Sequence, residues 1–191
     1  MMVYLTASLG FVCYLIYDIN SITWKNKAFQ KGFFAGTVFV ALATVLIFVE
    51  NLNYIQPLRA AVFGAAGLMM FGLLLYTLFF ALPFEATYVE ENREREAYME
   101  GVYGLCRHPG VLWYAGMYLC LAGALGTKAA LLEGVFLIGW NLLYVIVQDL
   151  VVFPATFSNY DVYKRCTPFL IPNGKSVKKC FHTIRSRCTM K

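Results

Sequence analysis

Long apolar stretches separated by short polar segments dominate the chain. A helix needs about 20 mostly apolar residues to cross a bilayer, and about 17–25 are tolerated. Five stretches meet or approach this length, and each predicts a membrane-spanning helix: residues 3–17, 33–49, 58–82, 111–125 and 129–153. The fourth stretch is short, and only Gly126, Thr127 and Lys128 separate it from the fifth. The pattern therefore predicts that the last two helices form a tight antiparallel hairpin.

Composition agrees with this pattern. Hydrophobic residues make up 60% of the 191 residues and charged residues only 14%, whereas soluble domains carry about 25% charged residues. Aromatic residues make up 17%, which suits belts at the membrane surface. We expect an all-α polytopic bundle forming one integral membrane domain over residues 1–191. Three N-terminal transmembrane helices fall in 1–82, the hairpin and an ordered tail in 83–172, and a basic tail in 173–191.

The distribution of positive charge predicts the orientation of the bundle. All but two of the 16 Lys and Arg residues lie between the first and second helices, between the third and fourth, or after the fifth. Arg59 and Lys128 are the two on the opposite side. Because cytoplasmic loops are enriched in Lys and Arg, we expect five crossings with the N-terminus outside and the C-terminus in the cytoplasm. The net charge of +5 is then explained by anionic membrane lipids as partners, and not by nucleic acid.

Between residues 83 and 108, acidic residues alternate with Arg93 and Arg95. Glu91 and Arg95 are four residues apart, a spacing typical of a solvated helix. The chain has six cysteines and two histidines, and their spacing matches no zinc, haem or iron–sulfur pattern. We therefore expect free thiols and no metal.

Two polar features stand out against the apolar background. Arg107, His108 and Pro109 come where the chain re-enters the membrane, and proline is well suited to begin a helix. Asp149 lies near the end of the fifth stretch, where an acid is costly unless it is paired or faces a polar cavity. An antiparallel hairpin would bring Asp149 to Arg107 and His108. Two interpretations stay open at this point: a structural Asp–Arg pair with Arg107 reaching toward lipid phosphate, or a polar pocket.

A wider pattern contains these residues. It runs from Gly101-Val102-Tyr103 through Arg107-His108-Pro109 and Asp149 to Phe157-x-x-Tyr160-x-x-Tyr163 and Leu170-Ile171-Pro172. In this order and spacing the chain resembles the isoprenylcysteine carboxyl methyltransferase family, and the related phospholipid methyltransferases share much of the pattern. The resemblance covers roughly residues 100–172. The three N-terminal helices resemble the family only in being apolar.

The resemblance implies a methyltransferase whose pocket for S-adenosylmethionine faces the cytoplasm and is closed by the C-terminal tail. Residues 83–172 then form the cofactor-binding catalytic region, with Arg107 and His108 as candidate catalytic residues. The acceptor implied is a hydrophobic or lipid-like molecule, either an isoprenylcysteine-like carboxylate or a lipid head group. The cofactor-binding residues carried over are Tyr103, His108, Pro109, Gly110, Val111 and Asp149, with Tyr98, Tyr88 and the segment from Arg95 as weaker candidates.

The chain departs from the family pattern at four positions. Val111 and Trp113 stand where the family usually has Tyr and Gly, and Leu150 stands where a second acid usually follows the first. Val145 replaces an Arg that helps to hold an isoprenylcysteine substrate in the family. The departures at Val111, Trp113 and Leu150 leave open a membrane scaffold that has lost cofactor binding. A second alternative is a sterol-reductase-like oxidoreductase that uses NADPH, because that class is similar in its C-terminal helical scaffold and has an Arg-His near the same place.

Overall fold

The structure is a computed structural model that describes residues 1–81 and 95–189. It is 81% helical, and the described residues form no β-strand. The prediction of an all-α polytopic bundle is confirmed.

Five long helices match the five predicted stretches: α1 (Met2–Ile22), α3 (Gly32–Glu50), α4 (Pro57–Leu75), α7 (Pro109–Leu125) and α8 (Lys128–Val147). A π-helical turn, η2 (Tyr76–Phe80), extends α4, and a second one, η3 (Gln148–Val152), joins α8 to α9 (Phe153–Thr156). In the described part of the chain, four continuous helical segments are long and apolar enough to cross a membrane, while α7 is a shorter apolar helix of 17 residues.

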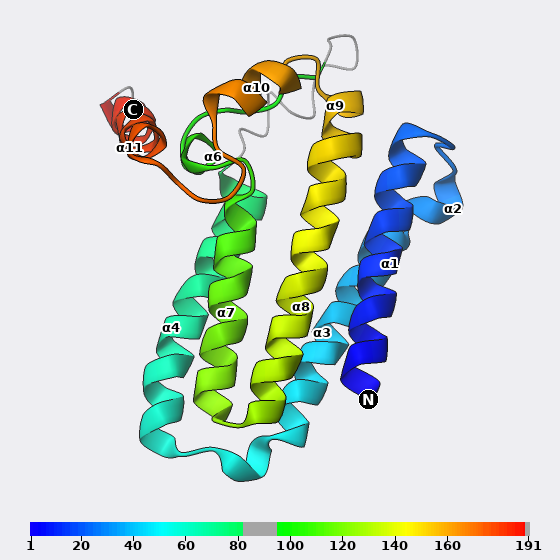
Figure 1. Cartoon of the computed structure of the whole chain (residues 1–191), viewed down its shortest axis with the longest axis vertical. Helices are drawn as coiled ribbons and strands as arrows, with labels where there is room; N and C mark the ends of the chain where they lie inside the picture. The colour runs from blue at the N-terminus through cyan, green and yellow to red at the C-terminus, as the bar shows by residue number, and fades with distance from the viewer. Residues whose placement is uncertain (82–94, 190–191) are drawn as a thin grey trace.

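Shorter elements lie at the ends of the long helices: α2 (Lys27–Gln30), η1 (Leu52–Tyr54), α6 (Val102–Leu105), α10 (Tyr160–Cys166) and α11 (Gly174–Thr189). Figure 1 shows α2, α6, α9, α10 and α11 at one end of the bundle, here called the α10 end. The turn between α7 and α8 and the N-terminus lie at the other end, here called the hairpin end. The acidic segment predicted to be helical falls mostly in 82–94, outside the described residues, and 95–99 is not helical, so the prediction is wrong for that part.

Local chemistry explains why the hairpin turns where it does. Gly126 ends α7 in the left-handed conformation, with φ of +68°, and its N–H donates to Ala122 O over 2.8 Å. The positive φ favours glycine here, and the guanidinium of Arg59 occupies the space that a Cβ would take. The hydroxyl of Thr127 then accepts from Ala130 N–H and caps the start of α8. The predicted antiparallel hairpin is confirmed.

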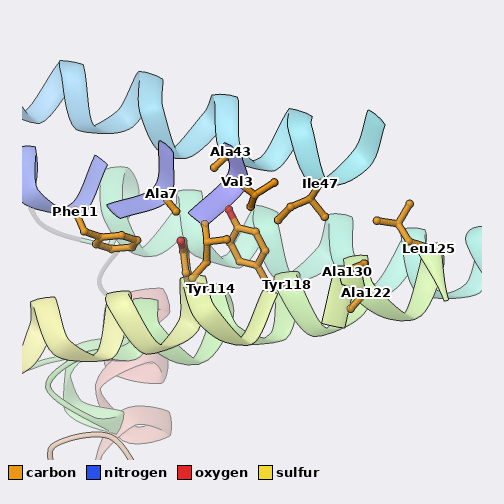
Figure 2. Packing of buried hydrophobic residues seen from close by; sticks show 11 residues of the cluster. Val3, Ala7, Phe11, Ala43, Ile47, Tyr114, Tyr118, Ala122, Leu125 and Ala130 are labelled. Carbon is orange, nitrogen blue, oxygen red and sulfur yellow. The ribbon is translucent and has the colours of Figure 1, made fainter. Parts of the chain in front are cut away.

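Close packing joins the helices into one bundle. Gly10 of α1 and Gly36 of α3 face each other so closely that an added Cβ on Gly36 would come 2.8 Å from Gly10 O. Small residues allow such backbone approach between membrane helices. The buried cluster then continues through α7, where Tyr114 meets Phe11 edge-on and Tyr118 contacts Tyr114 (Figure 2), and it includes Leu137 of α8.

The outward faces of α3 and α4 are apolar and uncovered. Within an apolar 18-residue stretch of each span, only 11% of the residues are buried for Pro57–Phe80 and 17% for Lys27–Glu50, against 33% for Met2–Ile22. Large apolar side chains such as Leu58, Leu68 and Phe34 are 72–80% exposed. A soluble protein does not carry apolar surface of this extent, so these faces are lipid-facing surfaces of a membrane protein.

Candidate functional site

The carboxylate of Asp149 is the centre of a polar cluster at the α10 end. Asp149 lies in the π-helical turn η3 and is 5% exposed. Its two oxygens accept from Arg107 Nε at 2.8 Å and Arg107 Nη2 at 3.1 Å, in the paired geometry that arginine makes with carboxylates. Its Oδ1 also accepts from Tyr160 Oη at 2.6 Å and lies 3.2 Å from His108 Nε2. Lys164 Nζ lies 3.9 Å from Oδ2.

The π-helical turn η3 contains Asp149 and the residue that follows it. A π-helical turn carries an extra residue and is frequent at functional sites. The buried Asp149 is followed directly by Leu150, which is 65% exposed. The position where the resembled family has its second acid is thus on the outer surface of this bundle.

Arg107 joins the cluster to the C-terminal tail. Its Nη1 donates to Thr167 O at 2.8 Å and to Lys164 O at 3.3 Å, and its backbone N–H donates to Pro168 O at 2.9 Å. The next residue repeats the pattern, because His108 N–H donates to Phe169 O at 3.3 Å. The segment between α10 and α11 is therefore held directly over the start of α7, and the predicted ordered tail is present.

Aromatic side chains enclose the imidazole of His108. Its ring stacks on Phe153, with centroids 5.7 Å apart and an interplanar angle of 10°, and meets Phe169 edge-on at 5.1 Å. The guanidinium of Arg107 lies 5.6 Å from the Phe169 ring centroid, close enough for a cation–π interaction. Burial lowers the pKa of His108 below its ordinary value of 6.5, and the hydrogen bond with Asp149 offsets this only in part. The lowered pKa favours the neutral imidazole of His108.

Tyr103 lies beside the cluster on the short helix α6. Gly101 starts α6 at φ of +57°, a conformation that favours glycine, and its N–H donates to Thr183 Oγ1 of α11 at 3.0 Å. Tyr103 Oη donates to Thr77 O in η2 at 3.0 Å, and Tyr163 Oη donates to Tyr103 O at 2.7 Å. Tyr103 thereby links α4, α6 and α10.

The structure brings most of the sequence-predicted residues together. Arg107, His108 and Asp149 form the cluster itself, and Pro109, Gly110 and Val111 make the first turn of α7 directly after it. Tyr98 contacts the Tyr103 ring edge-on with centroids 6.3 Å apart. Tyr88 lies outside the described residues.

Arg95 is placed elsewhere. It lines a cleft bounded by α1, α2 and α9, with Tyr17 and Thr156 among its other lining residues. Arg95 O also accepts from Ser158 N–H at 3.0 Å, which fixes its backbone against the loop before α10.

The positions that depart from the family pattern have structural roles. Trp113 Nε1 donates to Thr77 Oγ1 at 3.0 Å and joins α7 to η2. Val111 and Val145 are both buried, each 5% exposed. Valine at these two positions adds apolar packing and no charged group.

Sequence reasoning missed several members of the site. Tyr160 belongs to the family-like pattern but was not predicted as a site residue. Its hydroxyl donates to Asp149, and Asp149 raises the pKa of Tyr160 further after burial has raised it. Lys164 and Thr167 were not identified at all. Lys164 follows Tyr160 by four residues, the spacing of one helix face, which is a signal that could have found it. Thr167 lies just past the end of α10 and has no such signal. Nothing in the sequence marks Thr77.

The chain was compared with protein-family models, curated proteins and solved structures, and none of them matches it.

Proposed function

We propose that the protein is a membrane methyltransferase that transfers a methyl group from S-adenosylmethionine to a hydrophobic or lipid-like acceptor at the α10 end. One observation carries the proposal. Arg107, His108 and Asp149 come from two separate stretches of the chain and meet in one buried cluster under the tail that bears Tyr160 and Tyr163. This is the constellation that the resemblance to isoprenylcysteine and phospholipid methyltransferases requires.

The donor set fits S-adenosylmethionine. Arg107 and Lys164 suit its carboxylate, Asp149 suits its ammonium group or ribose hydroxyls, and the aromatic rings near His108 suit its adenine. Thr167 adds a specific observation, because its Oγ1 is buried and no described residue hydrogen-bonds to it. Buried hydroxyls normally have a partner, so this one is free to bind a polar ligand.

The residues of the chain would prepare methyl transfer by aligning the acceptor with the methyl group and by excluding water from the reacting atoms. S-adenosylmethionine supplies a methyl group on a positively charged sulfur, and its displacement requires alignment with a dehydrated nucleophile. The neutral imidazole of His108 donates Nε2–H to Asp149, which leaves Nδ1 as the proton acceptor. Nδ1 can therefore take a proton from an acceptor head group, while the surrounding phenylalanine rings exclude water.

We place the α10 end in the cytoplasm as part of the same proposal. Among the described residues, every Lys and Arg except Arg59 and Lys128 belongs to loops and tails at that end, and cytoplasmic segments carry this excess. S-adenosylmethionine would then enter from the cytoplasm and the acceptor from the bilayer.

The first test is a thermal melt of the detergent-purified protein with S-adenosylmethionine, S-adenosylhomocysteine or NADPH. A ligand that binds only the native state raises the melting temperature, and we expect saturable shifts with the two adenosyl ligands. His108→Ala should abolish these shifts, whereas Lys128→Gln at the hairpin end should keep them. No shift with either adenosyl ligand in the folded wild type would overturn the proposal, and a shift with NADPH alone would indicate an oxidoreductase.

A second variant separates ligand binding from folding. Thr167→Val removes a hydroxyl that has no described partner, so the melting temperature without ligand should stay the same. Its affinity for S-adenosylmethionine should fall by about tenfold, the loss expected for one hydrogen bond in a closed site. An unchanged affinity would remove Thr167 from the site.

One observation favours a second function, a membrane scaffold that binds no cofactor. Within the protein alone, the Asp149 carboxylate already contacts Arg107, His108 and Tyr160. A cluster satisfied in this way can serve simply to fasten the tail to the bundle. The same melts decide between the two functions, because the scaffold predicts no shift with any of the ligands.

A further inference from the structure

A second polar site lies at the α10 end, in the cleft that Arg95 lines. The cleft has a volume of about 620 Å³ and is bounded by the end of α1, by α2 and by α9. In Figure 1, α1 and α2 lie on one side of α9, and α11 lies on the opposite side. The lining includes the hydroxyl, amide and positively charged side chains of Tyr17, Ser21, Lys25, Gln30, Arg95 and Thr156.

The charge of this cleft is positive. Lys25 comes from the turn between α1 and α2, and Arg95 comes from the segment before α6, so the two cations belong to different walls. The described lining contains no carboxylate. Asp18 is near in sequence, but it is buried and its Oδ2 accepts from Gln148 Nε2 at 2.8 Å. Hydroxyl and amide donors from Ser21 and Gln30 complete a lining suited to an anion with several oxygens.

The backbone holds Lys25 in an unfavourable conformation. Lys25 has φ of +52° and is the only residue other than glycine with positive φ among the described residues. Lys25 N–H donates to Asn20 O at 2.8 Å, and the Asn20 side chain both donates to Asn26 O and accepts from Asn26 N–H. Asn20 is 1% exposed. A buried side chain thus fixes a strained turn that carries a cation, and such strain is typical of ligand sites.

The surroundings place the cleft at the level of lipid head groups. Trp24 is 65% exposed beside Lys25, and Phe29, Phe33 and Phe34 are 42–74% exposed on α2 and the first turn of α3. Exposed aromatic residues at the ends of membrane helices mark the interface between hydrocarbon and head groups. The cleft therefore opens where phospholipid phosphates lie.

We propose that this cleft binds the phosphate of an anionic phospholipid, with Lys25 and Arg95 as its two cationic contacts. The chemistry recognised is a phosphate oxyanion, and the interfacial aromatic residues favour a lipid as its source over free phosphate. The proposal does not depend on the methyltransferase activity.

The test measures thermal stabilisation of the purified protein, in a nonionic detergent, by short-chain phosphatidylglycerol, short-chain phosphatidylcholine or inorganic phosphate. We expect a saturable shift with phosphatidylglycerol that is much weaker with the other two. Lys25→Gln combined with Arg95→Gln should weaken the lipid affinity about fivefold for each charge removed. The matched control is Lys27→Gln combined with Lys31→Gln, which removes two charges from the same end, outside the lining of the cleft, and should keep the affinity.

A further variant remains informative if the double variant folds poorly. Lys25→Gly relieves the positive φ, so it should melt at a higher temperature without lipid and still lose lipid affinity. Equal stabilisation by inorganic phosphate would overturn the choice of a lipid, and equal stabilisation by phosphatidylcholine would overturn the choice of an anion. If the control pair loses as much affinity as the cleft pair, the attraction is general to the surface and the site is refuted.

Discussion

Arg59 and Arg107 lie at opposite ends of the same bundle, and they use the same side chain differently. Arg59 donates only to main-chain carbonyls, those of Tyr54, Ala124 and Leu125. Two of these carbonyls close α7, where a cation is favoured by the helix dipole. Arg107 also reaches carbonyls, but two of its nitrogens bind Asp149.

The carboxylate makes the difference between the two ends. At the hairpin end, each bond of Arg59 completes the end of a helical segment, and the role is structural. At the α10 end, a buried acid is shared by side chains from the start of α7 and from α10. A shared, buried acid can exchange partners with a ligand, whereas a capped helix end has nothing to exchange. The comparison teaches that the partner decides the role of an arginine at a helix end: main-chain carbonyls tie Arg59 into the fold, whereas the carboxylate of Asp149 gives Arg107 bonds that a ligand can replace.

Among substitutions at the α10 end, Asp149→Ala should lower the folding stability most. Arg107 would keep a buried charge without its partner, and losing one member of a buried pair costs about 3–5 kcal/mol of folding free energy. The measurement is unfolding by SDS titration in mixed micelles, followed by helicity. The double variant Arg107→Met with Asp149→Leu is the control and should recover most of the loss, because no charge is stranded. A single variant as stable as the wild type would contradict the buried pair.

Tyr160→Phe should have the next largest effect. It removes the hydroxyl that donates to Asp149 over 2.6 Å while keeping the ring. Hydrogen bonds to charged groups contribute about 1.5–3 kcal/mol, and the same SDS titration measures the loss. Tyr54→Phe at the hairpin end is the matched control and should change little, because Tyr54 is 62% exposed. Equal losses in the two variants would mean that the bond to Asp149 adds nothing.

Arg59→Met tests the structural end of the comparison. The apolar stem is kept and the bonds to the end of α7 are lost, so we expect a cost of about 1 kcal/mol, the upper range for a cation at a helix C-terminus. The melting shift caused by S-adenosylmethionine should stay as in the wild type. Loss of that shift would show that the two ends are coupled and that Arg59 has more than a local role.

The smallest expected effect is the pH dependence that comes from His108. Burial lowers its pKa in the folded state below 6.5, so the unfolded chain binds a proton at a pH where the folded protein does not. Stability is then fully present above about pH 6.5 and falls as the pH drops below it, by less than about 1.4 kcal/mol per pH unit. Melts from pH 7.5 to 5.5 should show a shallower decline in His108→Gln. Equal slopes would mean that His108 does not titrate in this range.

Much of this architecture could be predicted from residues. The five apolar stretches, Pro109 at the start of α7 and Gly126 at its end specify helices and their limits through local preferences. The short link at Thr127 predicted the antiparallel hairpin. The hairpin in turn predicted that Asp149 lies near Arg107. Prediction failed for Thr77 and Thr167, because the side chains that donate to them are brought near only by packing: Trp113 and Tyr103 for Thr77, and Arg107 for Thr167. It also could not separate Arg95 from the Asp149 cluster.

The sequence by itself determined that the chain is a bundle of apolar helices, because hydrophobic length and composition act locally and require no knowledge of neighbours. It also determined which few polar residues fall near helix ends. Only the tertiary structure decided how the site is completed: Asp149 is buried and Leu150 is exposed within the π-helical turn η3, Tyr160 donates to Asp149, and the tail lies over Arg107. The physical reason is that a carboxylate in a membrane bundle needs partners, and those partners come from segments whose positions depend on how the helices pack.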